Sequence, residues 1–161
     1  MKPRLKAPTP QRSAIMRAIK SKNTGPERAV RKLLWPIARG YRLHAKELPG
    51  RPDVVYRKRK LAIFVHGCFW HGHGCRRGGR TPKTNAAFWR GKIARSQERD
   101  AAALKALRKL RWRCAIVFEC ELTDEERVAR KLRRAVEGAP VIASEAKQSS
   151  PGVLKERRKE R

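Results

Sequence analysis

Residues 66–75 hold the densest group of metal-binding side chains in the sequence. This short stretch, His-Gly-Cys-Phe-Trp-His-Gly-His-Gly-Cys, contains three of the four histidines and two of the four cysteines. Thiolate and imidazole are ligands that Zn²⁺ prefers, and a structural zinc site needs four of them. Cys68, His73 and Cys75 could supply three from one loop, and a distant cysteine could supply the fourth. Buried thiols beside surface histidines are the alternative, but the clustering favours zinc.

A second group of residues with possible chemistry begins at Asp53. Residues 48–56, Leu-Pro-Gly-Arg-Pro-Asp-Val-Val-Tyr, predict a turn followed by a strand that Asp53 opens. A basic turn then leads into the apolar strand 61–65. A carboxylate at the start of one strand and metal ligands after its hairpin partner would face one cleft, as in metal-dependent phosphodiesterases. An ordinary turn residue explains the spacing of Asp53 equally well.

The charge of the chain points to a polyanionic partner. Lys and Arg number 42 against 14 Asp and Glu, a formal net charge of +28. Nucleic acid is the leading partner, although ribosomal, chromatin-type and membrane-surface proteins share this balance. No apolar run approaches the roughly 20 residues of a membrane span, and the N-terminus lacks the apolar core of a signal peptide. We therefore expect a cytoplasmic protein whose cysteines bind metal rather than form disulfides.

The hydrophobic pattern predicts one α/β domain over residues 12–137. Residues 1–11 are typical of a flexible basic arm, and residues 138–161 of a disordered basic tail. Helices are expected over 13–20, from within 23–27 to Pro36, from 84 or 85 to 110, and over 123–136; strands are expected over 54–56, 61–65 and 112–118, the last apolar enough to be central. Ser13, Thr84 or Asn85, and Thr123 are the expected caps. The long helix should bury Phe88, Trp89, Ile93, Leu104, Leu107 and Leu110.

Four further side chains have alternative interpretations. Glu27 lies in the first turn of the second helix, where an exposed carboxylate would compensate the helix dipole. Asp100 is a carboxylate in a strongly basic helix, and an ion pair with a neighbouring arginine or lysine explains it as well as a role in a site. Cys120 follows the third strand and is the expected fourth zinc ligand. Cys114 lies inside that strand and should pack as a small hydrophobic residue.

Seven motifs occur in order along the chain. They are Pro49-Gly-Arg-Pro-Asp53, Phe64-Val-His-Gly-Cys-Phe-Trp-His71 with His73 and Cys75, Pro82-Lys-Thr-Asn85, Phe88-Trp89, Lys92-Ile93, Arg99-Asp100 and Phe118-Glu-Cys120. Together they closely resemble the very short patch repair (Vsr) DNA mismatch endonucleases over roughly residues 12–137. The resemblance implies a fold similar to type II restriction endonucleases, a mixed sheet flanked by helices with a structural zinc. It also implies magnesium-dependent nicking of one DNA strand beside a T:G mismatch, the product of 5-methylcytosine deamination.

The resemblance also implies the catalytic residues. Asp53 matches the carboxylate that binds magnesium. Val65 stands where the family usually has Thr, whose main-chain carbonyl is a metal ligand, so the substitution keeps the carbonyl. His71 matches the general base, and a neutral imidazole can take a proton from water near pH 7. The surrounding active-site positions are matched by His66, Glu27 and Asp100.

The zinc and DNA positions of the family are matched as well. A zinc held by four protein ligands has no open position and would be structural; the matching residues are Cys68, His73, Cys75 and Cys120. Apolar side chains that wedge into the duplex at the mismatch are matched by Met16, Phe69 and Trp70. The sequence departs from the family at Gly72 and Gly74, which replace bulkier residues, at Ser96, where Asn is usual, and in its tail. These departures bear on substrate specificity rather than on the reaction.

Two functions of other classes remain open. A zinc-stabilised DNA-binding protein without catalysis would explain the charge and the cysteines, but would leave Asp53, His71 and Asp100 without a role. A related restriction-type endonuclease would cut unmodified or differently modified DNA. We expect a monomer that acts on double-stranded DNA with a T:G mismatch and that works beside mismatch-repair proteins.

Overall fold

The fold is built on one mixed sheet. The computed structural model of the chain describes residues 7, 9–18, 22–80 and 82–138, without the side chains of residues 12, 15 and 16. Four strands in this part of the chain lie in the order β1 (Arg42–Leu43), β2 (Val54–Tyr56), β3 (Leu61–His66) and β4 (Arg113–Phe118). The first three are antiparallel neighbours, whereas β3 and β4 are parallel. The carboxyl ends of β3 and β4 therefore meet at one edge of the sheet.

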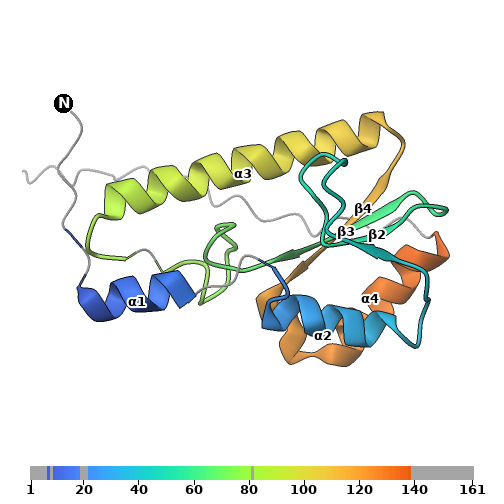
Figure 1. Ribbon diagram of the computed structural model, residues 1–161, viewed down its shortest axis with the longest axis horizontal. Helices are drawn as coiled ribbons and strands as arrows, with labels where there is room; N and C mark the ends of the chain where they lie inside the picture. The colour runs from blue at the N-terminus through green and yellow to red at the C-terminus, as the bar shows by residue number, and fades with distance from the viewer. Residues whose placement is uncertain (1–6, 8, 19–21, 81, 139–161) are drawn as a thin grey trace, which may run out of the picture.

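Helices cover both faces of this sheet. The described helices are α1 (Pro10–Ala18), α2 (Gly25–Leu34), α3 (Ala86–Lys109) and α4 (Glu125–Glu137), with a 3₁₀ helix η1 (Glu119–Thr123) between β4 and α4; α1 is not among those that cover the sheet (Figure 1). Figure 1 shows α2 and α4 together on one side of the sheet and the long α3 on the other. The predicted mixed sheet flanked by helices is confirmed. Within the described residues, no helix is long and apolar enough to cross a membrane.

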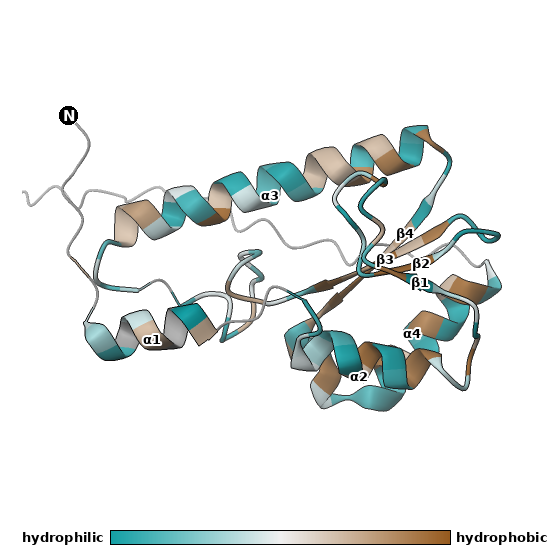
Figure 2. Cartoon of the chain, viewed as in Figure 1, coloured by the Kyte–Doolittle hydropathy of each residue, from teal (hydrophilic) through white to brown (hydrophobic). Residues whose placement is uncertain are grey.

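The alternation of side chains along β3 divides the core into two parts. Figure 2 shows β3 in brown, the colour of hydrophobic residues, between α3 and the pair α2 and α4. Leu61 and Ile63 point to α2 and α4, where Val30, Leu34, Val128 and Leu132 complete the larger core cluster. Ala62 and Phe64 point to α3 and pack with Leu107 in the smaller one. The same period of two carries His66 to the α3 side of the sheet. The strand pattern thus decides which layer the residues after β3 can reach.

Two predicted helix starts are wrong. Helix α1 begins at Pro10, so Ser13 lies inside it and the last two residues of the predicted arm are helical. Proline suits this position because the first N–H groups of a helix have no intrahelical partner. Helix α4 is capped by Asp124, whose side chain accepts a hydrogen bond from the Arg127 amide at 2.9 Å, rather than by Thr123. The predicted tail lies outside the described residues except for Gly138, the C-cap of α4, and so does the remainder of the arm except residues 7 and 9.

Strand β4 was predicted to be central, and this is wrong. In the described sheet β3 has a partner on each side, whereas β4 pairs only with β3. Only Ala115 and Val117 of β4 are buried, on the α2 and α4 side, which is the alternation of a half-covered strand. The two-residue strand β1 was not predicted, because Arg42-Leu43 is too short and too exposed to show a pattern.

Helix α3 buries much less than its apolar residues suggested. Of the six predicted core residues only Leu107 is fully buried, while Phe88 is 39% and Leu110 52% exposed. The reason is visible in Figure 1, where only the C-terminal half of α3 lies over the sheet. The N-terminal half extends past the ends of the strands (Figure 1), so its aromatic residues are available for other contacts.

Candidate active site and metal centre

The predicted cysteine and histidine ligands meet just beyond the ends of β3 and β4. Each of the four residues offers one ligand atom, and these atoms all lie within 4.8 Å of one another; the residues are Cys68, His73, Cys75 and Cys120. Cys120 comes from η1 and is brought to the loop because β3 and β4 are parallel neighbours. Its amide donates to Cys68 Sγ at 3.3 Å, and its own Sγ lies 3.4 Å from His73 Nδ1. Cys114 packs instead against the smaller core.

The electrostatics of this cluster favour a bound cation. Burial, and then the neighbouring thiols, raise the pKa of Cys120 to about 12. Burial also raises the pKa of Cys68. Burial opposes ionisation of Cys75 as well, but hydrogen bonds from His73 and from the Gly78 amide outweigh it and lower the pKa of Cys75 to about 6. Several thiolates in one site repel each other, and a divalent cation would remove that cost.

The loop that carries three of the ligands is tightly closed at Gly78. A Cβ atom on Gly78 would lie 1.9 Å from the carbonyl oxygen of His73, so only glycine fits there. At Gly72, where φ is +59°, a Cβ would lie 2.6 Å from Gln97 Nε2 of α3. The amide of Gln97 lies 3.3 Å from the carbonyl oxygen of His71 and 3.4 Å from that of Gly72. Glycine at position 72 therefore permits close packing of this loop on α3.

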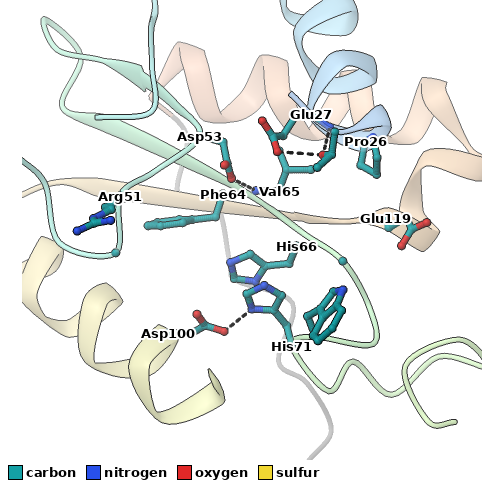
Figure 3. A pocket seen from close by; sticks show the side chains of 14 residues that line it. Pro26, Glu27, Arg51, Asp53, Phe64, Val65, His66, His71, Asp100 and Glu119 are labelled. Atoms are coloured by element: carbon teal, nitrogen blue, oxygen red, sulfur yellow. Dashed lines mark hydrogen bonds and ion pairs between the residues drawn. The ribbon is translucent and has the colours of Figure 1, made fainter. Parts of the chain in front are cut away.

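The predicted catalytic residues line one cleft of about 410 Å³. It lies between the start of α2, the β2–β3 hairpin, the loop after β3 and the middle of α3 (Figure 3). Among the fourteen lining residues are all six predicted ones, Glu27, Asp53, Val65, His66, His71 and Asp100. The predicted facing of Asp53 and the loop after β3 across one cleft is confirmed. Their individual roles remain predictions.

Asp53 stands immediately before β2 at the wall of the cleft. Its Oδ2 accepts a hydrogen bond of 2.7 Å from the Val65 amide, which fixes the carboxylate against β3. Burial raises the pKa of Asp53 to about 6, and the nearby charge of Glu27 adds to this rise, while the Val65 amide opposes it. Burial and the facing carboxylate of Glu27 therefore disfavour the ionised form of Asp53, and a nearby positive charge would favour it. A divalent cation bound to oxygen ligands would provide that charge.

Glu27 was expected at the exposed head of its helix, and this is wrong. The residue is only 5% exposed. Its Oε1 accepts from the Thr24 hydroxyl at 2.9 Å and its Oε2 from the Asn23 amide at 2.9 Å, while Thr24 Oγ1 accepts from the Glu27 amide. This variant of the capping box, in which the carboxylate accepts from the backbone amide that precedes the cap, turns the carboxylate back over the start of α2. Because that end of α2 borders the cleft, Glu27 faces Asp53 instead of solvent.

His66, His71 and Asp100 form the opposite wall. The two imidazole rings stack with centroids 3.6 Å apart and planes 6° apart. His71 Nδ1 lies 2.5 Å from Asp100 Oδ2, so the partner of Asp100 is this histidine rather than a neighbouring arginine or lysine. With the hydrogen on Nδ1, the Nε2 atom of His71 can accept a proton. Burial, and then the charge of His71, lower the pKa of His66 to about 4, which keeps His66 neutral near pH 7.

An aromatic group stands beside the cleft. Phe69 and Trp70 contact each other at 5.1 Å between ring centroids, and Trp89 of α3 lies 5.5 Å and 6.0 Å from them. Lys92 Nζ lies 5.3 Å from the ring centre of Trp70 and 5.2 Å from that of Trp89. Phe88 extends the group through Trp89. The sequence assigned Trp89 to the core, but the structure joins it to the predicted DNA-contact residues; the side chain of Met16 is outside the described part.

Two further residues were not predicted to belong to these sites. Phe118, the last residue of β4, stacks on His73 with centroids 4.0 Å apart and meets His66 edge-on at 5.7 Å. His44 lies next to Glu27 and Asp53, and the ligand atoms of these three residues are within 4.8 Å of one another. Phe118 belongs to the motif Phe118-Glu-Cys120, which was its one indication. The isolated His44 had none.

The chain is similar in sequence to known proteins over most of its length. The family model described as DNA mismatch endonuclease Vsr matches residues 6–77. The type II nicking enzyme V.XorIIP of Xanthomonas oryzae pv. oryzae is 46% identical over 127 residues, which cover 79% of this chain and 93% of the relative. The chain belongs to the Vsr family. The DNA mismatch endonuclease Vsr of Escherichia coli is 40% identical over 117 residues, covering 73% of this chain and 74% of its own.

Membership of the Vsr family makes this protein a DNA endonuclease. The type II nicking enzyme V.NmeAIP of Neisseria meningitidis, 41% identical over 128 residues, covers 80% of this chain and 91% of its own. The match to the Vsr family model contains Glu27, Asp53 and the loop after β3, but ends before α3 and β4. Asp100 and Cys120 come from that later part, and the structure brings both to the sites.

Proposed function

We propose that this Vsr-family endonuclease nicks one strand of duplex DNA beside a T:G mismatch in a magnesium-dependent reaction. Such mismatches arise when 5-methylcytosine is deaminated. The observation that carries the proposal is the convergence, in one cleft, of the Asp53 carboxylate with the paired His71 and Asp100. A cation-binding carboxylate facing a positioned imidazole is the pairing that phosphodiester hydrolysis needs.

We assign each residue of the cleft a role in the proposed reaction. Magnesium would be held by the Asp53 carboxylate and the main-chain carbonyl of Val65, where it would neutralise charge at the scissile phosphate. Asp100 holds the His71 ring through Nδ1, so that Nε2 can take a proton from the attacking water. The neutral His66 supports His71 by stacking. Glu27, held by its capping box, orients solvent on the other wall.

The same proposal covers the fold and the second metal. We assign to Cys68, His73, Cys75 and Cys120 a structural zinc, because three sulfurs and one imidazole form a closed tetrahedral set. The arrangement of the sheet, with α3 on one face and α2 and α4 on the other, supports the likeness to type II restriction endonucleases. A zinc at this place would hold the loop after β3 to the end of β4.

Recognition of the mismatch is assigned to the aromatic group. Phe69 and Trp70, with Met16 from α1, would insert at the wobble pair, where unstacking costs less than the few kcal/mol of an intact step. Lys92, stacked against Trp70 and Trp89, places positive charge where the DNA backbone would pass. The formal charge of +28 supplies the attraction to duplex DNA that does not depend on sequence.

A nicking assay tests the proposal. The zinc-loaded protein is incubated with matched C:G and mismatched T:G duplexes, with and without Mg²⁺. We expect one strand of the T:G duplex to be cut, only in the presence of Mg²⁺. Equal cutting of both duplexes would indicate a restriction-type specificity. Binding without cutting, under every cation tried, would reject the magnesium-dependent reaction.

A further inference from the structure

His44 occupies an unusual place behind the wall of the cleft. Its Nε2 atom is buried and has no hydrogen-bond partner among the described residues. The nearest carboxylate oxygen, Glu27 Oε2, lies 3.7 Å away, which is too long for a hydrogen bond. A buried polar atom without a partner is costly, so this nitrogen calls for an explanation.

The backbone holds His44 firmly in this place. The residue has a φ of 51°, in the left-handed region that few residues other than glycine adopt. Its amide donates to the carbonyl oxygen of Asp53 at 3.1 Å, and the next amide, of Ala45, donates to Pro52 at 3.2 Å. The imidazole is therefore tied to the same turn that presents Asp53.

The spacing of the three side chains fits one shared cation. Ligand atoms of Glu27, His44 and Asp53 lie within 4.8 Å of one another. Two ligands bound at about 2.1 Å to one cation lie about 3 to 4.2 Å apart, so the 3.7 Å between His44 and Glu27 falls inside this interval. Each carboxylate oxygen accepts more than one contact, so the capping bonds of Glu27 leave room for a cation.

We propose that His44 is a nitrogen ligand of the divalent cation in the cleft, together with Asp53 and Glu27. The inference rests on the proposed function, because it concerns the cation assigned to Asp53. Magnesium favours oxygen ligands, whereas imidazole favours transition metals. A site with one imidazole and two carboxylates should therefore bind Mn²⁺ distinctly better than Mg²⁺, and Mn²⁺ should support nicking at lower concentration.

The test measures where Mn²⁺ binds, independently of activity. Zinc-loaded, full-length protein is titrated with Mn²⁺, and pulsed electron paramagnetic resonance detects coupling of the ion to histidine nitrogen. We expect this coupling in the wild type and its loss in His44→Asn, since Asn tolerates a positive φ but carries no imidazole. Because even outer-shell changes cost about 10- to 100-fold in metal affinity, His44→Asn should weaken Mn²⁺ binding at least about tenfold. Mg²⁺ binding should change less than about threefold, given its preference for oxygen.

His71→Ala is the matched control, because His66, His71 and Asp100 form a second group that could hold a cation. This variant should keep the nitrogen coupling. Coupling that persists in His44→Asn and disappears in His71→Ala would overturn the inference and move the cation to the opposite wall. A wild-type protein that binds Mn²⁺ without nitrogen coupling would also overturn it, whether or not the variants fold. Nicking of T:G duplexes by that same protein would show that the proposed function still stands.

Discussion

The cysteine cluster and the cleft that holds Asp53 and His71 both lie near the carboxyl ends of β3 and β4, but they are assembled differently. Three of the four cluster ligands come from residues 68–75, and one side chain from η1 completes the set. The cleft gathers its residues from α2, the β2–β3 hairpin, the loop after β3 and α3. A closed set of four ligands can form from one loop and a single residue of another element. An open cleft needs several elements to be placed correctly at once.

The two regions also differ in what their charges do to stability. In the cluster hydrogen bonds lower the pKa of Cys75 to about 6, whereas burial and the neighbouring thiols raise that of Cys120 to about 12, so a bound cation is needed for the thiols to ionise together. In the cleft burial raises the pKa of Asp53 to about 6 and lowers that of His66 to about 4, so burial opposes the charged form of each group. The ionised Asp53 therefore reduces the stability of the folded state near pH 7, whereas His66, neutral at that pH, reduces it only in acid. We expect the cluster to hold the fold together and the cleft to weaken it.

The largest effect should follow from breaking the cluster. Cys120→Ala removes the ligand that joins the loop to β4, and structural zinc binding is coupled to folding. We expect loss of about one zinc per chain and a fall in melting temperature of more than about 10 °C, with loss of nicking as a consequence. Zinc analysis and thermal unfolding measure this.

Cys114→Ala is the control for that variant, since Cys114 packs against the smaller core and is not in the cluster. It should keep its zinc and lose about 1 kcal/mol or less. A Cys120→Ala protein with full zinc content and unchanged melting temperature would refute the ligand set, and Cys114 would be the next candidate.

The second largest effect should separate the cleft from the cluster. Asp53→Asn should reduce nicking at least about 10⁴-fold, because the cation contributes several kcal/mol to the transition state. The zinc should remain, because Asp53 is not part of the cysteine cluster. Single-turnover assays on a T:G duplex, with zinc analysis in parallel, measure the two regions separately. Residual nicking near the wild-type rate would remove Asp53 from the mechanism.

The same variant should be more stable than the wild type without magnesium. The pKa of Asp53 is raised from 3.8 to about 6, so Asp53 stays protonated to a higher pH in the folded state than in the unfolded state. Ionisation of this carboxylate therefore lowers the stability of the folded state. The loss grows as pH rises from about 4 to 6 and reaches about 3 kcal/mol above pH 6. Asp53→Asn should melt higher than the wild type at pH 8 and alike at pH 3.5. Equal melting at pH 8 would mean that the cleft does not strain the fold.

A smaller effect is expected from the opposite wall. His71→Ala should slow nicking about 10²- to 10⁴-fold, the usual contribution of a positioned proton acceptor. It should retain zinc, because His73 rather than His71 lies in the cysteine cluster. If His71→Ala loses zinc while His73→Ala keeps both zinc and fold, then His71 is the zinc ligand and our assignment of the two histidines is wrong. Activity and zinc content of both variants decide this.

The smallest effect concerns Phe118, the ring that both regions share. Its side chain stacks on His73 and meets His66 edge-on. Aromatic contacts of this kind contribute about 0.5 to 1.5 kcal/mol, so Phe118→Leu should lower the nicking rate about two- to tenfold. Phe118→Trp should nick at about the wild-type rate, because the aromatic contact is kept. Rates of the two variants at saturating DNA test the link; equal rates for Leu and Trp would show that the two regions act separately.

The sequence alone determined the parts of both sites that depend on near neighbours. The hairpin that places Asp53 opposite the end of β3 follows from a Pro-Gly turn, a basic turn and two apolar runs. The loop ligands follow from their spacing within residues 68–75. Turn and strand preferences act over a few residues, which is why these predictions could be made locally. Cys120 was also predicted, because it directly follows a recognisable strand.

Only the tertiary structure decided which distant groups meet. The pairing of Asp100 with His71 depends on how α3 crosses the sheet, and an isolated helix offers Asp100 several basic neighbours instead. Glu27 is buried because the start of α2 borders the cleft. His44 gained its place from a left-handed turn that no sequence pattern indicated. In each case the partner lies on another element, and packing between elements rather than local preference sets the distance.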